Sequence, residues 1–225
     1  MNSNKLFKWA ENEYNRLLIL LFWLLVSIAL PERQVIAKGV ILIFFFVAIL
    51  SIIRQIRPGK WWLKYYTALV LISLTLLVLQ MLGVLNVFVV GHGLSVIEFA
   101  LFIVLGVPIL LIQQEFFLTQ TVTADTLKGG IAIYILMGIA WSTVYIVMFD
   151  FDPNAFDGIT QSQLQSDFLH LSFVTLTTVG YGNILPIAAW ARIATDLEAV
   201  VGVMYPSILI SRLVSLYGNH SQESL

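Results

Sequence analysis

Residues 175–183 read TLTTVGYGN, and this stretch decides the fold. Two of its residues, Gly180 and Gly182, alternate with larger residues, and glycine adopts positive φ at little steric cost. Left- and right-handed residues that alternate along a chain turn successive backbone carbonyls toward the same side. A Gly-Tyr-Gly triplet on its own fits an ordinary turn equally well, so the surrounding sequence has to decide between the two interpretations.

The composition is that of an integral membrane protein. Of the 225 residues, 59% are hydrophobic and only 11% are charged, and the mean hydropathy is +0.91. Soluble domains contain about 45–50% apolar residues. A net charge of -1 provides no basic excess for binding nucleic acid. The absence of cysteine excludes disulfides and thiolate metal sites.

Six apolar stretches reach or approach the length that crosses a bilayer. A helix needs about 20 mostly apolar residues to cover the roughly 30 Å hydrocarbon core. We therefore predict an all-α membrane protein with six transmembrane helices at residues 14–30, 35–53, 65–90, 94–112, 129–149 and 188–217. The first stretch also fits a signal peptide, with Ser27-Ile28-Ala29 as a cleavage site, but we expect it to be retained.

Residues 150–186, between the fifth and sixth stretches, are too polar to cross in one piece. Because residues 168–179 within them are apolar, we predict a re-entrant segment made of a pore helix and then a loop. The helix begins near Ser162, in a capping box with Gln165, or at Ser166-Asp167. Either start directs the partly negative C-terminus of the helix toward the loop.

In this setting, the loop sequence resembles the selectivity filter of the potassium-channel family. The resemblance implies the established mechanism of that family, in which backbone carbonyls replace the water around K+. It implies that K+ binds the carbonyls and the Thr178 hydroxyl, and that the side chains of Val179 and Tyr181 point away and brace the filter. The K+-binding filter is then formed by Thr178, Val179, Gly180, Tyr181 and Gly182. K+ is expected as the permeant ion, and no cofactor is expected.

One chain supplies one such loop, whereas a ring of carbonyls needs several loops around an axis. The resemblance implies a tetramer of identical chains and covers about residues 122–218. We divide the chain into a four-helix membrane domain at 1–115, this pore domain, and a short cytoplasmic tail at 219–225. Residues 94–112 contain no Lys or Arg, so we do not expect the four-helix domain to sense voltage.

Four residues near the loop are predicted to support the filter: Thr175, Thr177, Asn183 and Glu198. Glu198 lies inside the last apolar stretch, where a charge costs at least about 2.5 kcal/mol unless it is paired or wetted. Asp196 either braces the filter in the same way or lies at the outer water interface. Some family members carry carboxylates at the positions of Val174 and Asn183, so we do not expect inactivation that depends on that pair.

Other residues are candidates for gating or structural roles. Gly202 lies where the inner helix of the family has its gating-hinge glycine, so the resemblance implies a gating hinge at Gly202 and Pro206. Proline lacks a backbone donor and kinks helices, so a kink near these residues is also expected. Close helix packing is an equally good interpretation of Gly202. His170 either responds to external pH or is simply packed or solvated. Glu98 and Lys38 are predicted to form an ion pair with each other.

The predicted function is passive, K+-selective permeation, and the chain is not expected to be an enzyme. A sensor or scaffold that keeps the channel fold without conducting is the alternative, and a coupled transporter is disfavoured because the chain has one intact loop. The distribution of basic residues places both termini in the cytoplasm. The expected location is a bacterial inner membrane, with three further copies of the chain, lipid and K+ as partners.

Overall fold

The structure, a computed structural model, describes residues 13–28, 35–55, 60–81, 93–118, 123–160 and 163–222. Its helices are α2 (Glu13–Ile28), α3 (Val35–Gln55), α4 (Lys60–Met81), α5 (Gly93–Leu118), α6 (Ala124–Phe151), α7 (Leu164–Leu176) and α8 (Ala189–Gln222). Between α6 and α8 it also contains the 3-10 helix η2 (Pro153–Ala155) and the two-residue strands β1 (Phe156–Asp157) and β2 (Leu185–Pro186). The described chain is thus helical apart from this short ladder, as predicted.

The helices follow the predicted apolar stretches, with differences at their ends. Helix α4 is described up to Met81, and residues 82–92, which include the predicted end at residue 90, lie outside the described part. Helix α5 continues to Leu118 and contains Pro108. Two helical segments of the described chain are long and apolar enough to cross a membrane, namely α6 and residues 189–215 of α8, whereas α2, α4 and α5 contain shorter apolar segments.

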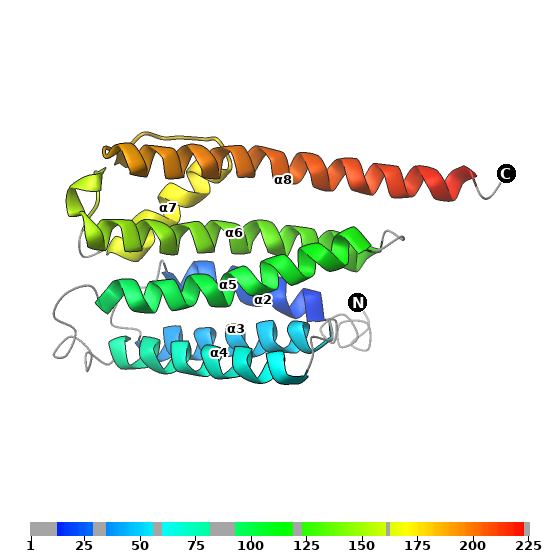
Figure 1. The fold of residues 1–225 in the computed structure, drawn as a ribbon, viewed down its shortest axis with the longest axis horizontal. Helices are drawn as coiled ribbons and strands as arrows, with labels where there is room; N and C mark the ends of the chain where they lie inside the picture. Colours follow the sequence, from blue (N-terminus) through cyan, green and yellow to red (C-terminus); the bar gives the residue numbers. More distant parts are fainter. Residues whose placement is uncertain are drawn as a thin grey trace.

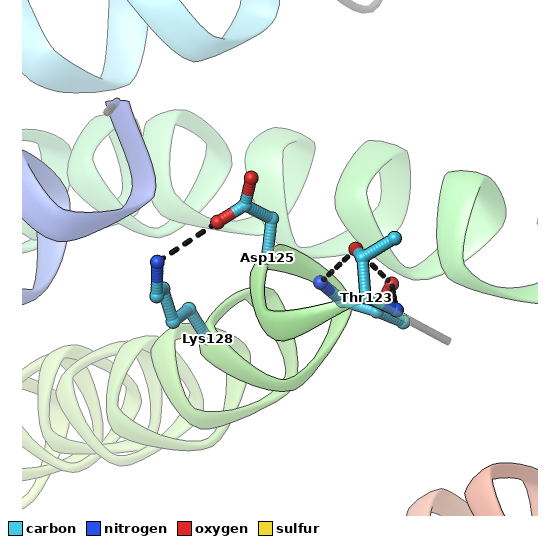
Figure 2. A network of polar contacts seen from close by, with 4 residues as sticks. Thr123, Asp125 and Lys128 are labelled. Carbon is cyan, nitrogen blue, oxygen red and sulfur yellow. Dashed lines mark hydrogen bonds and ion pairs between the residues drawn. The ribbon is translucent and has the colours of Figure 1, made fainter. Parts of the chain in front are cut away.

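Helix α6 begins where a threonine caps it. The Thr123 hydroxyl accepts a hydrogen bond from the Thr126 backbone N–H, and the Thr126 hydroxyl accepts one from the Thr123 N–H, both at 3.2 Å. Lys128 adds a 2.9 Å ion pair with Asp125 one turn along (Figure 2). These bonds satisfy N–H groups that lack partners at a helix start.

Helices α2 to α6 lie roughly along one axis, and α8 runs along the side of α6 away from α2 to α5 (Figure 1). Helix α7 crosses between α6 and α8 and contacts both. The start of α2 and the end of α8 lie at the same end of the molecule, opposite the end at which α6 finishes (Figure 1). In this part of the chain, α7 therefore lies between the two long helices α6 and α8.

Two apolar clusters hold this arrangement together. The larger cluster joins α2 to α5 with one face of α6, whose Ile133 and Leu136 are fully buried in it. The smaller cluster is aromatic and centres on Phe168 of α7, with ring centroids 5.1 Å from Phe156 and 5.5 Å from Phe149. Aromatic side chains bury large areas, so this cluster fixes the start of α7 against the end of α6.

The ladder between β1 and β2 ties the segment before α7 to the segment after the loop. Phe156 pairs with Pro186 and Asp157 with Leu185 in antiparallel register. The Ile187 backbone N–H donates to the Ala155 carbonyl at 2.8 Å and extends the connection. Residues on both sides of the loop are thereby held next to each other.

The start of α7 lies at Leu164, between the two predicted starts. Its N-cap residue, Gln163, makes no side-chain capping bond, and the predicted capping residue Ser162 lies outside the described part. Asp167 lies in the first turn, as predicted for an acid at a helix start, and accepts a 2.7 Å hydrogen bond from the Thr160 N–H.

Glu98 of α5 is buried, as expected for a carboxyl group that faces the interior of a membrane domain. The side chain of its predicted partner, Lys38, lies outside the described residues, so the Glu98–Lys38 pair stays a prediction.

Candidate functional site

The C-terminal end of α7 holds the start of the loop through backbone hydrogen bonds. The Thr178 N–H donates to the Thr175 carbonyl at 2.9 Å. The N–H groups of Val179 and Gly180 both donate to the Val174 carbonyl, at 2.8 and 3.2 Å. The last turn of α7 thus uses its free carbonyls to fix the backbone of the loop.

Positive φ angles occur at every second residue of the loop. The values are 61° at Thr178, 54° at Gly180 and 75° at Gly182. The two glycines were predicted to adopt this conformation, but Thr178 was not. A β-branched residue with positive φ is an outlier that persists only where surrounding structure holds it. The hydrogen bonds to the end of α7 provide that restraint.

The carbonyl groups of the loop remain available. Within the described part of the chain, no N–H or hydroxyl group donates to the carbonyls of Thr178, Val179, Gly180 or Tyr181. These residues are also exposed in the single chain. Exposed carbonyls without a donor in the chain can replace the water around a cation, so a run of them is suited to binding one.

His170 of α7 contacts the far end of the loop. Its ring stacks on the Tyr181 ring, with centroids 5.7 Å apart and an interplanar angle of 5°. Its Nε2 atom lies 3.3 Å from Oδ1 of Asn183, which is a predicted support residue. His170 is therefore packed against residues of the loop itself, and a response to external pH stays a prediction.

The other predicted support residues differ in what they do. Thr175 provides the carbonyl that accepts the Thr178 N–H. The Thr177 hydroxyl donates to the Phe173 carbonyl at 2.6 Å, so it caps α7 and makes no side-chain hydrogen bond to the loop. Sequence reasoning cannot separate these two threonines because both belong to the same motif.

Glu198 lies fully buried where α6, α7 and α8 meet. Its Oε2 atom accepts a hydrogen bond from the Tyr145 hydroxyl of α6, and its Oε1 atom lies 2.5 Å from Oγ of Ser172 in α7. The same Ser172 Oγ lies 2.7 Å from the Gly138 carbonyl of α6. Asp196 is exposed in the single chain and, unlike Glu198, is not buried between these helices.

Comparison with known proteins identifies relatives of the part of the chain that contains the loop. The family described as ion channel matches residues 133–219. The LctB protein of Bacillus caldotenax is 31% identical over 105 residues, which cover 43% of this chain and 75% of LctB. Two-pore potassium channel 4 of Arabidopsis thaliana is 31% identical over 98 residues, which cover 43% of this chain and 34% of that longer protein. The chain belongs to the potassium-channel family.

Membership of the potassium-channel family makes the chain a membrane protein and a channel rather than an enzyme. The match includes the loop, Glu198 and most of α6 and α8, and it leaves out α2 to α5. The chain spans only about a third of two-pore potassium channel 4 and about a fifth of two-pore potassium channel 5, also from Arabidopsis thaliana. No solved structure matches the chain.

The residues of the predicted hinge, Gly202 and Pro206, belong to α8, and Gly202 lies against the end of α7. A Cβ atom added to Gly202 would overlap the Leu176 backbone, including its carbonyl oxygen. Helix α8 continues without interruption through Gly202 and Pro206. Close packing therefore accounts for Gly202, and a hinge at Gly202 and Pro206 stays a prediction.

Two tyrosines that sequence reasoning missed connect the same region. Tyr134 of α6 donates to the Leu176 carbonyl at 2.9 Å, and Tyr205 of α8 donates to the Gly130 carbonyl at 3.0 Å. Their rings stack with centroids 6.1 Å apart. Because each contact joins residues far apart in sequence, no local pattern indicates it.

Proposed function

We propose that the chain is one subunit of a homotetrameric channel that passes K+ selectively and passively through residues 178–182. The observation that carries the proposal is the alternation of positive φ at Thr178, Gly180 and Gly182 in a segment whose carbonyls have no donor among the described residues. Alternation of this kind allows successive carbonyls to line one path.

Neutral oxygen ligands suit a permeant cation such as K+ for a physical reason. A permeant ion must shed its water and then leave again, so its ligands have to replace water without holding the ion as tightly as carboxylates do. The loop contains no charged side chain between Thr175 and Asn183. The names of the two Arabidopsis thaliana relatives agree with K+ as the ion.

The exposed face of α8 supports assembly into a tetramer. A single chain provides one loop of carbonyls, and further copies arranged with closed cyclic symmetry would complete the ring around an ion. Helix α8 exposes a set of apolar side chains that neighbouring copies or lipid would cover: Val200, Val203, Met204, Ile208, Ile210 and Val214.

We place α2 to α6 and α8 across a cell membrane, with both termini in the cytoplasm. Figure 1 supports this placement, because α7 runs inward from the end at which α6 finishes, and the loop returns to that end, where α8 begins. That course is the re-entrant segment expected for a filter on the external side. Lys128, near the start of α6, then lies on the cytoplasmic side, where basic residues are favoured.

The test is the reversal potential of purified protein in a planar bilayer with K+ on one side and Na+ on the other. We expect a K+-selective reversal potential in the wild type. Gly180→Asp should abolish that selectivity, because a side chain at positive φ strains the loop and its carboxylate changes the ligands. Gly106→Ala, at an open position of α5, is the matched control and should leave selectivity intact.

Current without K+ selectivity from the wild type would overturn the proposal. So would K+ selectivity that survives Gly180→Asp. An assembled tetramer that carries no current under any condition would instead support the sensor or scaffold alternative.

A further inference from the structure

The hydrogen-bond contacts around Glu198 indicate whether its carboxyl group carries a proton. Three oxygen–oxygen contacts form one continuous chain: Tyr145 to Glu198, Glu198 to Ser172 at 2.5 Å, and Ser172 to the Gly138 carbonyl at 2.7 Å. All four groups belong to the buried junction of α6, α7 and α8. At such distances each contact needs a proton between its two oxygens.

The neighbours alone cannot supply three protons. A tyrosine and a serine hydroxyl carry one proton each, and a backbone carbonyl carries none. If Glu198 were ionised, either its contact with Ser172 or the contact of Ser172 with Gly138 would hold two oxygens together without a proton. A protonated Glu198 satisfies all three: Tyr145 donates to Oε2, the Oε1 hydroxyl of Glu198 donates to Ser172, and Ser172 donates to the Gly138 carbonyl.

We propose that Glu198 is a neutral hydrogen-bond donor that positions the pore helix α7, and with it the filter. The proposal rests on the proposed function, because it assigns Glu198 a role in holding the same filter. The donor chain runs from α6 through α8 to α7 and back to α6, so α7 is held from both sides. The last turn of α7 in turn anchors the backbone of Val179 and Gly180 through the Val174 carbonyl.

Infrared difference spectroscopy of reconstituted protein tests the proton directly. The difference between wild type and Glu198→Gln should contain the C=O stretch of a protonated carboxylic acid. Asp196→Asn, which changes the exposed carboxylate on the same helix, should leave that band in place. Ser172→Ala should shift the band to higher frequency, because the acid proton loses its acceptor. If the wild-type band is absent, Glu198 is ionised and the proposal is wrong.

Reversal potentials test the positioning role. Glutamine keeps a donor and an acceptor in the same shape, so Glu198→Gln should keep the K+/Na+ permeability ratio within about twofold of the wild type. Ser172→Ala should lower the ratio severalfold, because α7 loses the side-chain hydrogen bonds that join it to α6 and α8. Glu198→Leu, which removes every bond of the carboxyl group, should lower it at least as much.

The outcomes separate this inference from the proposed function. A ratio that falls equally in Glu198→Gln and Glu198→Leu would overturn the role as a neutral donor, even if the wild type is a K+ channel. If Glu198→Leu fails to assemble, the permeability ratio of Ser172→Ala still tests the positioning role, and the infrared band still tests the proton on Glu198. A wild type without K+ selectivity would contradict the proposed function, whereas the band would still report the proton on Glu198.

Discussion

Gly202 shows how strongly a single position can be constrained. It lies in the middle of α8, where alanine is normally the better helix residue by about 1 kcal/mol. Here a Cβ atom would meet the backbone of Leu176, which is the last residue of α7 and cannot rotate aside as a side chain can. The steric term therefore opposes the helix propensity.

We expect Gly202→Ala to destabilise the assembled protein by about 1–3 kcal/mol, the usual cost of overpacking. The measurement is the fraction of tetramer that survives heating in detergent. Gly106→Ala is the matched control, because nothing lies within 4 Å of the added Cβ. It should be neutral or stabilising. Equal stability of the two variants would show that α7 and α8 are not in close contact at Gly202.

At this scale the sequence predicts some of the site and misses the rest for a physical reason. Positive φ at Gly180 and Gly182 follows from residue type, whereas Thr178 adopts it because the end of α7 holds it there. Glu198 is identifiable as an interior residue, because a charge in an apolar helix needs a partner. Its partners are not identifiable, since Ser172 and Tyr145 lie 26 and 53 residues away.

At the scale of elements, Tyr134 joins three helices. The Leu176 carbonyl is one of the groups that a helix end leaves without a partner, and Tyr134 supplies the missing donor. The same hydroxyl lies 3.5 Å from the Gly202 carbonyl of α8. Any change in the distance between α8 and the end of α7 therefore alters this contact.

Tyr134→Phe keeps the ring and removes the hydroxyl. We expect a loss of about 1 kcal/mol in tetramer stability, since the Leu176 carbonyl loses its donor. The measurement is again survival of the tetramer on heating, together with the reversal potential. Tyr65→Phe is the control, because the Tyr65 side chain is 70% exposed on α4. A Tyr134→Phe protein as stable as the control would mean that this bond does not hold α7.

At the scale of the whole molecule, α2 to α5 and the filter are separable in sequence. Every described contact of the loop reported above comes from α7 and the segments next to it, while α2 and α5 pack on the opposite face of α6. The apolar stretches predicted these helices, but not that α5 continues to Leu118, because boundaries depend on packing that hydropathy does not record.

Removal of residues 1–118 should leave the K+/Na+ permeability ratio within about twofold of the full chain, since distant sites usually act independently. The truncated tetramer should lose heat stability in detergent, because Ile133 and Leu136 lose the cluster that buries them. Bilayer recordings and heating of the purified fragment measure the two effects. Loss of selectivity in an assembled fragment would show that α2 to α5 shape the filter.

Helix α8 is longer than the membrane is thick. Its 34 residues extend about 51 Å at about 1.5 Å per residue. A tilt of about 40°, the upper end of the usual range, still leaves about 39 Å along the membrane normal, against a hydrocarbon core of about 30 Å. In the proposed membrane placement, α8 therefore extends past the hydrocarbon core into the headgroup region. A force applied at its far end reaches Gly202 only through Pro206, where proline removes a backbone hydrogen bond of the helix.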